Sequence, residues 1–515
     1  MQNLQFSNLI KAGLISGVSL VLGLLFNYFF YGKVPGIAFP LYFVLIIAGL
    51  FTLTMFFKKK INKEVFWLLI PLMFFSSMVF VRSSEMLTVF NIAASLLLLL
   101  VIVKISFGKK VKNFLIEDYI KVFFLPIKFI RPLFQTLSDL FLSFKAKNDQ
   151  KVFSQVVKGI LMTIPVLFVF LLLFSSADLI FQKYVSNLIN INIKPEIIFR
   201  SILILIATLA YIGAYSYLFR KQDNQINVRQ NSESYSIGRI ENSILLGSVN
   251  VLFFVFMFIQ LTYLFGGESN ISALGFTYAE YARRGFFELI TVAVVSLFLL
   301  LFTEKYIIKK ETGHTIGFKF LSTVLIVQVM LIMASAFTRL SLYEEAYGFT
   351  DQRFFSHAFI ILLAVIFCLL LYKIYKNKKE KIFAFHVFIS IILFLAVMNF
   401  LNPDIFIARR NIERFIVTGK LDARYLGRLS SDAIPNTIKI LDISDEDLRN
   451  SFAHGLYWRA QDINSSYFSK WQSLNISRMK AKKILDSRMS KIEPYKDYQQ
   501  QNPDSVDEIS EILKK

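Results

Sequence analysis

The 515-residue sequence is poor in the side chains that form disulfides and most transition-metal sites. Its one cysteine, Cys368, lies inside an apolar run, which excludes an intramolecular disulfide and a cysteine-based metal site. The four histidines, His314, His357, His386 and His454, are spread over different loops and apolar segments. They do not show the spacing of a metal-ligating cluster, so we predict no bound metal.

Motifs that carry known chemistry are also missing. The sequence contains no phosphate loop, no dinucleotide-binding glycine fingerprint, no His-Glu-x-x-His and no nucleophile elbow. We therefore expect no cofactor. Charged residues make up only 18% of the chain, and Asp and Glu are nearly absent from the middle of the apolar runs. A proton relay would need buried carboxylates there, so the sequence disfavours a proton-coupled transporter.

Apolar residues dominate what is present. They account for 55% of the chain, with 56 Phe residues and a mean hydropathy of +0.55. A water-soluble domain of this size cannot bury so much apolar sequence. Long apolar runs alternate with short charged segments, as they do in chains that cross a membrane repeatedly. The sequence thus predicts an all-α, polytopic transmembrane helix bundle whose partner is the lipid bilayer.

A membrane-spanning helix needs about 20 mostly apolar residues. The third and fourth candidate runs are short and are joined only by residues 82–85, which predicts a tight hairpin. The first run is longer than a signal-peptide core of about 7 to 15 residues, and no small-residue cleavage site follows it, so we expect an uncleaved first span. The eleven candidate spans are 12–30, 37–57, 65–81, 86–103, 157–174, 197–219, 243–265, 285–302, 318–337, 357–375 and 382–400.

Lys and Arg residues mark every second loop between these spans. The segments 58–64, 104–156, 220–242, 303–317 and 373–381 hold about 26 of them, against about 8 in the intervening loops. Positive residues near span ends stay in the cytoplasm. With an odd number of spans, this alternation predicts a cytoplasmic N-terminus and an extracytoplasmic C-terminal tail.

Four regions follow from this topology. They are four N-terminal transmembrane helices in 1–103, a basic amphipathic segment in 104–156, a seven-helix transmembrane core in 157–401 and a helical tail, disordered in part at its end, in 402–515. We expect the basic segment to form short amphipathic helices at the cytoplasmic membrane surface, the alternative being a re-entrant or packed connector. In the tail, Ser444 followed by acidic residues predicts a helix start.

The formal net charge of +21 does not indicate a nucleic-acid partner. The excess Lys and Arg residues lie in short loops beside apolar runs, whereas the tail nearly balances its acids and bases. No basic stripe with interleaved aromatic residues occurs on a soluble domain. Within the spans, Asn250, Gln260, Gln328 and Asn399 are the main polar residues, and we expect them to form hydrogen bonds between helices.

Four polar segments fall on the predicted outer face, each at the end of a span: 175–178, 276–288, 338–357 and 402–414. An unpaired charge at the membrane boundary is costly, so we expect these segments to converge on one outward-facing site, with Arg284 and Glu288 paired at helical spacing. The alternative is a set of separate interfacial ion pairs, each tying its own helix end. The candidate ligand-binding residues are Asp178, Glu280, Arg283, Arg284, Glu288, Arg339, Tyr343, Glu345, Arg409 and Arg410.

Three functions fit these features. The first is a protein that binds or transports an anionic or lipid-like ligand, since clustered arginines can hold a carboxylate, a phosphate or a lipid headgroup. The second is a membrane enzyme acting on a lipid-linked substrate, with Asp178, Glu280 and Glu345 as acid or base groups. The third is a structural or signalling partner of other cell-envelope proteins. We favour the first, because no pair of nucleophile and base can be identified.

The same four segments also carry a family resemblance. The runs Ser-Ser-Ala-Asp at 175–178, Tyr-Ala-Glu-Tyr-Ala-Arg-Arg-Gly-Phe at 278–286, Arg-Leu-Ser-Leu-Tyr-Glu-Glu-Ala-Tyr-Gly at 339–348, and Asn-Pro-Asp at 402–404 with Arg-Arg-Asn at 409–411, resemble a bacterial multispanning membrane family. That family is catalogued as a domain of unknown function, of the type numbered 4153 or 4173. The resemblance extends from about residue 161 to about 435. It implies a protein of the bacterial cytoplasmic membrane and brings no established activity, substrate or catalytic residue.

Overall fold

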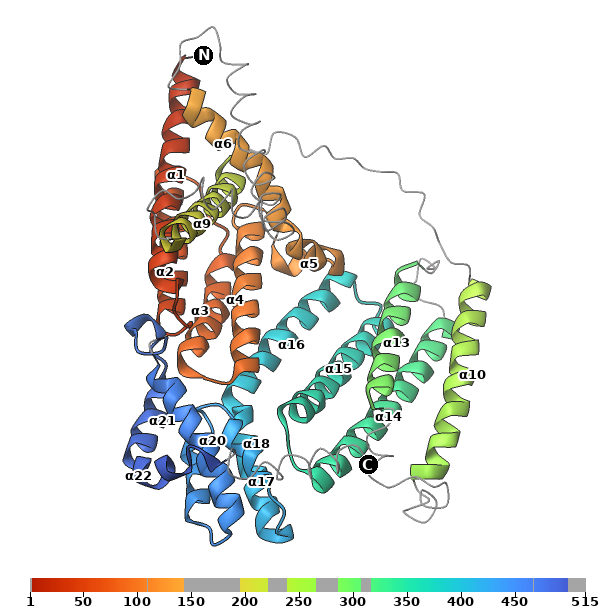
Figure 1. Cartoon of the computed structure of the whole chain (residues 1–515). Helices are drawn as coiled ribbons and strands as arrows, with labels where there is room; N and C mark the ends of the chain where they lie inside the picture. The colour runs from red at the N-terminus through yellow and green to blue at the C-terminus, as the bar shows by residue number, and fades with distance from the viewer. Residues whose placement is uncertain are drawn as a thin grey trace, which may run out of the picture.

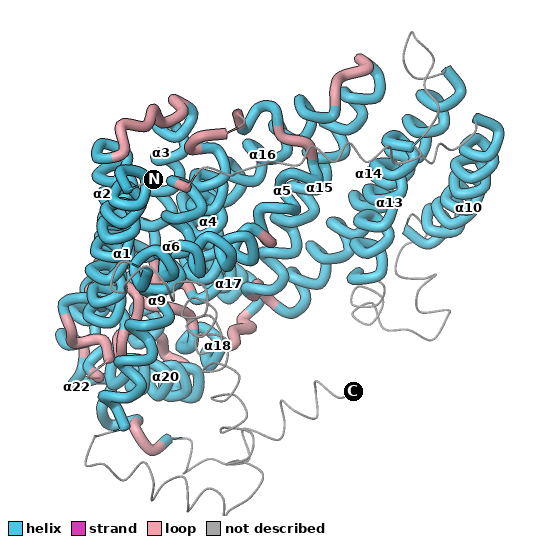
Figure 2. The backbone as a smooth tube through the Cα atoms, turned by 90° about the horizontal axis from the view of Figure 1, so that it is seen from above, coloured by secondary structure: helices cyan, strands magenta, loops and turns pink. Residues whose placement is uncertain are grey.

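The computed structural model describes residues 2–108, 110–142, 195–220, 239–264, 286–306, 316–465 and 467–498. Within these residues all regular secondary structure is helical, as Figure 2 shows. The predicted all-α fold is confirmed. Each apolar run forms a helix because a helix satisfies its own backbone hydrogen bonds, which no water can do inside a bilayer.

Ten of the described helices are long and apolar enough to cross a membrane. The predicted span at 157–174 lies outside the described residues. One helix is much longer than expected, because the predicted span 318–337 continues to Tyr347 as a single helix of 32 residues. The ten helices are α1 (Gln2–Phe30), α2 (Ala38–Phe56), α3 (Glu64–Val81), α4 (Glu85–Ile105), α9 (Pro195–Phe219), α10 (Arg239–Leu264), α13 (Phe286–Tyr306), α14 (Ile316–Tyr347), α15 (Asp351–Tyr375) and α16 (Glu380–Leu401).

Where the structure describes them, the basic loops and the polar loops lie at opposite ends of the bundle. At one end, which we call the inner end, the Lys59 amine donates to the Phe219 carbonyl at 3.0 Å, and the Glu64 carboxylate accepts from the Val111 amide at 2.6 Å. At the other, outer end, the Arg200 guanidinium lies 4.7 Å from the centroid of the Tyr31 ring. For the loops within the described ranges, the alternation along the sequence is therefore also an alternation in space. Which end faces the cytoplasm stays a prediction.

The spanning helices form two groups that differ from a simple division along the chain (Figure 1). α9 packs along α1, and together with α2, α3 and α4 these helices share one apolar core. α10, α13, α14 and α15 share a second core. α16 lies between the groups and contacts α3, α4 and α15.

The segment after α4 forms short helices at the inner end: η1 (Val111–Asn113), α5 (Ile116–Phe123), η2 (Leu125–Phe129) and α6 (Ile130–Leu142). α6 packs on α9, where the Thr136 and Ser216 hydroxyls lie 2.6 Å apart. Phe123, Phe124 and Ile127 are more than half exposed and interleave with basic residues. This segment is amphipathic, and its contact with the membrane surface stays a prediction.

The tail after α16 folds into a compact set of short helices on the outer end, drawn in blue in Figure 1. The helix expected to begin with Ser444 begins one residue later, because Asp445 is the N-cap and its carboxylate accepts from the Leu448 amide at 3.0 Å. The tail helices are α17 (Pro403–Thr418), α18 (Ala423–Arg428), α19 (Ile434–Thr437), η3 (Ile438–Asp442), α20 (Glu446–Asn464), η4 (Trp471–Ser473), α21 (Ile476–Ser487), α22 (Met489–Ile492) and η5 (Glu493–Tyr495).

Candidate functional site

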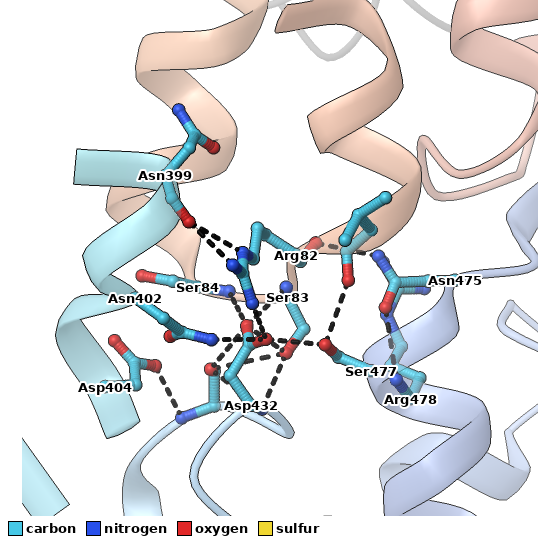
Figure 3. Close-up of polar contacts among 12 residues, drawn as sticks. Arg82, Ser83, Ser84, Asn399, Asn402, Asp404, Asp432, Asn475, Ser477 and Arg478 are labelled. Carbon is cyan, nitrogen blue, oxygen red and sulfur yellow. Dashed lines mark hydrogen bonds and ion pairs between the residues drawn. The ribbon is translucent and has the colours of Figure 1, made fainter. Parts of the chain in front are cut away.

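A single buried carboxylate joins the tail to the outer end of the bundle (Figure 3). Asp432, in the loop between α18 and α19, is 4% exposed. Its Oδ2 accepts from the backbone amides of Ser83 and Ser84 at 2.6 and 3.0 Å. Its Oδ1 accepts from the Asn402 side-chain amide at 3.1 Å and from the Ser477 hydroxyl at 2.5 Å. One side chain thus connects the turn between α3 and α4, the end of α16 and the start of α21.

The position of Asp432 follows from the chemistry of helix ends. The first amides of a helix have no partner within it, and the helix dipole favours a negative charge there. Ser83 and Ser84 precede α4, so their amides offer such a site. Beside them, Arg82 donates from Nε and Nη2 to the last-turn carbonyl of Asn399 at 3.0 and 2.7 Å. This hub was not foreseen from the sequence, which marked the segment 82–85 only as a tight hairpin.

Two further carboxyl groups meet next to this hub. Asp404, near the start of α17, is 3% exposed and accepts from the Ser430 amide at 3.1 Å. Burial, with the charges of Asp351 and Asp432, raises the pKa of Asp404 to about 6. The Tyr425 hydroxyl donates to the Asp351 Oδ2 at 3.2 Å, and the charge of Asp351 contributes to the raised pKa of Asp404. A raised pKa favours the protonated form, so buried Asp404 is a proton-binding group at the contact between the tail and α15.

The third predicted segment forms the outer turns of α14. Arg339 and Glu344 are 8% and 4% exposed. The Glu344 Oε2 lies 3.3 Å from Nδ1 of His357 on α15. The Arg353 guanidinium lies 4.1 Å from the centroid of the Tyr343 ring. These contacts place an arginine, a carboxylate and a histidine in the interior at the outer end of α14 and α15.

The fourth segment meets the third, but through residues that were not among the candidates. Asn411 accepts from the Phe349 amide at 2.9 Å and donates to the Phe349 carbonyl at 2.8 Å. Arg414 donates to the backbone carbonyl of Glu345 at 2.8 Å, near the end of α14. Gly348 is needed at this contact, because its φ is +85° and a Cβ there would lie 2.6 Å from the Asn411 Oδ1.

Arg409 and Arg410, which were candidates, are exposed on α17. Their ion pairs are with Glu413 of the same helix, at 4.0 and 3.2 Å. Glu288 is exposed at the start of α13, and its predicted partner Arg284 lies outside the described residues. Asp178, Glu280 and Arg283 lie outside them as well. The convergence of all four segments on one site therefore stays a prediction.

The second helix group contains buried polar side chains at three depths. Near the inner end, the Lys373 amine lies 2.5 Å from the Glu304 carboxylate, and both side chains are at most 5% exposed. In the middle, the Gln328 amide donates to the Asn250 carbonyl at 3.1 Å. Near the outer end lie Arg339 and Glu344. The buried polar residues of this group are Asn242, Asn250, Ser296, Thr303, Glu304, Ser322, Gln328, Ser335, Arg339, Glu344 and Lys373.

We call this set of buried polar side chains in the second helix group the column. It holds more polar groups than packing between helices requires. Asn250 and Gln328 do hydrogen-bond between α10 and α14, as predicted. Within the described part of the chain, however, the Asn250 Oδ1 and the Gln328 Oε1 accept no hydrogen bond. Burying Glu304 with Lys373 also costs several kcal/mol of desolvation, which only close pairing offsets. Lys373 falls both in the predicted span 357–375 and in the basic segment 373–381, and its position inside an apolar run was the signal of burial.

These features define the class of the molecule, an integral multi-pass membrane protein with a helical tail folded on one end of its bundle. The family described as "Domain of unknown function (DUF4153)" matches residues 69–440, and the chain belongs to this family. The match begins within α3, so it includes most of α3 and all of α4, which the resemblance had placed outside. No curated protein and no solved structure matches the chain.

Proposed function

We propose that the protein binds an anionic solute at the outer end of α14 and α15 and transports it along the second helix group. The observation that carries the proposal is the column of buried polar side chains from Glu344 and Arg339 through Gln328 and Asn250 to the pair Lys373 and Glu304. Ionisable groups inside a bilayer are expensive, and they usually mark the path of an ion or a substrate.

The position and charge of each residue in the column define its role in anion binding and transport. Arg339 supplies a planar, permanently charged donor for a carboxylate or phosphate at the outer end. The amide oxygens of Asn250 and Gln328 that have no partner in the described chain supply polar groups at mid-depth. The Lys373 amine, held by Glu304, offers a second cation near the inner end. An anion entering from the outer end would thus meet a cation at each end of the column.

Binding is tested with purified full-length protein and four probe anions: sulfate, phosphate, acetate and decanoate. A probe that binds the folded state raises the melting temperature. We expect at least one to do so for the wild type and for the control Arg428→Gln, which changes an exposed arginine of the tail. We expect the increase to be lost in Arg339→Gln and kept in part in Arg339→Lys. The control separates binding from the general stabilisation that sulfate and phosphate give any protein. Equal increases in all variants, or none with any probe, would contradict the proposal.

Transport is tested with the same anion, radiolabelled, in proteoliposomes. Glu304→Gln leaves Lys373 without its ion-pair partner and should lower uptake by about tenfold or more, because the pair is buried. Arg428→Gln should keep wild-type uptake. Binding without uptake in the wild type would contradict the transport part of the proposal, and the protein would then be a receptor.

A further inference from the structure

Three cations from distant parts of the chain gather at the outer end of the first helix group. Lys33 lies in the loop between α1 and α2, Arg200 on α9, and Lys470 in the tail directly before η4. Burial and then the charges of Arg200 and Lys470 hold the pKa of the Lys33 amine below its usual range. Glu196 pairs with Arg200 at 2.6 Å and offsets one of the three charges. The cluster therefore keeps a net positive charge.

Half-exposed aromatic rings surround these cations. Tyr28 and Trp471 are 51% and 43% exposed, and their ring centroids lie 6.3 Å apart. The Lys33 amine lies 4.8 Å from the centroid of the Tyr28 ring, and the Arg200 guanidinium lies over Tyr31. Tyrosine and tryptophan with this exposure are typical of the headgroup level of a membrane.

Backbone contacts hold the tail loop against the segment that joins α1 and α2. The Ile37 amide donates to the Leu474 carbonyl at 2.9 Å, at the start of α2. The Val34 amide donates to the Ser473 hydroxyl at 3.1 Å. A Cβ on Gly36 would lie 2.4 Å from the Leu474 carbonyl oxygen, so only glycine permits this approach. Because α1 ends at Phe30 and α2 begins nearby, the loop that carries Trp471 lies beside the ends of two spans.

We propose that Lys33, Arg200 and Lys470, with Tyr28 and Trp471, bind the phosphate of an anionic phospholipid in the adjacent leaflet. Three cations beside one another repel, and a phosphate group relieves that repulsion by accepting hydrogen bonds from all of them. The aromatic rings lie along the glycerol and upper acyl region of such a lipid. The site is separate from the column in the second helix group and does not depend on the proposed transport.

The chain offers a direct probe, because it has three tryptophans, Trp67, Trp458 and Trp471. In a Trp67→Phe, Trp458→Phe protein, Trp471 is the one source of tryptophan fluorescence. This protein is reconstituted into phosphatidylcholine vesicles that contain a small fraction of spin-labelled lipid. The fluorescence of Trp471 should be quenched several-fold more by labelled phosphatidylglycerol than by labelled phosphatidylcholine. A protein that retains only Trp458, which is on α20 within the tail, should show no such preference.

Variants that remove positive charges test whether the cluster of Lys33, Arg200 and Lys470 causes the preference for phosphatidylglycerol. Lys33→Gln with Lys470→Gln should abolish the preference for phosphatidylglycerol, whereas Lys420→Gln with Lys439→Gln removes the same charge elsewhere in the tail and should keep it. Lys470 is exposed, so Lys470→Gln alone provides a folded variant with an intermediate effect. An unchanged preference in the cluster variants would overturn the proposal. Loss of the preference on adding inorganic phosphate would also overturn it, because the site would then bind the free anion.

Discussion

Asp404 shows how position alone changes the chemistry of a common residue. It lies near the start of α17, where the helix dipole favours a carboxylate. Burial next to Asp351 and Asp432 has the larger effect and raises its pKa to about 6. Asp404 therefore keeps its proton to a pH well above that at which a free aspartate loses it.

This shift predicts a pH-dependent stability. A carboxyl group whose pKa is raised in the folded state stabilises that state fully below its unfolded value of 3.8, and the contribution is lost as the pH rises through about 6. The full difference of about two pKa units corresponds to roughly 2 to 3 kcal/mol. We expect the melting temperature of the wild type to fall between about pH 4 and pH 7, and we expect Asp404→Asn to reduce that fall.

The control for this prediction is Asp442→Asn. Asp442 is exposed, and its hydrogen bond with Lys491 lowers its pKa, so its replacement should leave the fall near pH 6 in place. Melting curves in detergent over this pH range provide the measurement. Identical pH profiles for the wild type and Asp404→Asn would show that Asp404 does not hold the proton.

At the scale of elements, the loop between α18 and α19 holds the tail on the bundle. Asp432→Ala would leave the amides of Ser83 and Ser84 and the side chain of Asn402 without their acceptor in a buried place. Each lost partner costs about 1 to 3 kcal/mol. We expect tail opening to become easier by at least about 3 kcal/mol, which raises the rate of trypsin cleavage within the tail on the order of 100-fold.

Asp442→Ala is the matched control, since it removes an exposed carboxylate that pairs with Lys491 and Arg488 within the tail. Exposed ion pairs contribute little, so cleavage of this variant should match the wild type. If Asp432→Ala were cleaved no faster than Asp442→Ala, the tail would be held mainly by its apolar contacts with the bundle.

At the scale of the whole molecule, the two ends of the bundle carry different chemistry. The amphipathic helices α5 and α6 lie at one end of the bundle, and the tail lies at the other (Figure 1). The Lys59 amine bonds to the Phe219 carbonyl at the first end, and Asp351 and Tyr425 meet at the second. The excess of Lys and Arg residues in alternate loops predicts that the first end is cytoplasmic.

Orientation is measured by labelling intact cells with an impermeant thiol reagent after Cys368 has been replaced. A cysteine at Ser465 in the tail should react, and one at Asn224 in the basic loop after α9 should not. The opposite pattern would reverse the topology and would place the proposed anion entry on the cytoplasmic side.

The sequence by itself determined the spans, their alternation and the helical tail, because apolar length and the placement of Lys and Arg are properties of each segment alone. It also identified 338–357 and 402–414 as polar segments at span ends, and the structure buries Arg339, Glu344 and Asp404 there. Only the tertiary structure decided which partners meet. Ser83 and Asp432 are 349 residues apart, and Lys373 and Glu304 belong to different helices. In a membrane protein, residues that face lipid and residues that face another helix are both apolar, so periodicity does not reveal which face packs against which neighbour. That choice is made by the fit of side chains between helices, and it decides where a buried charge finds its counterpart.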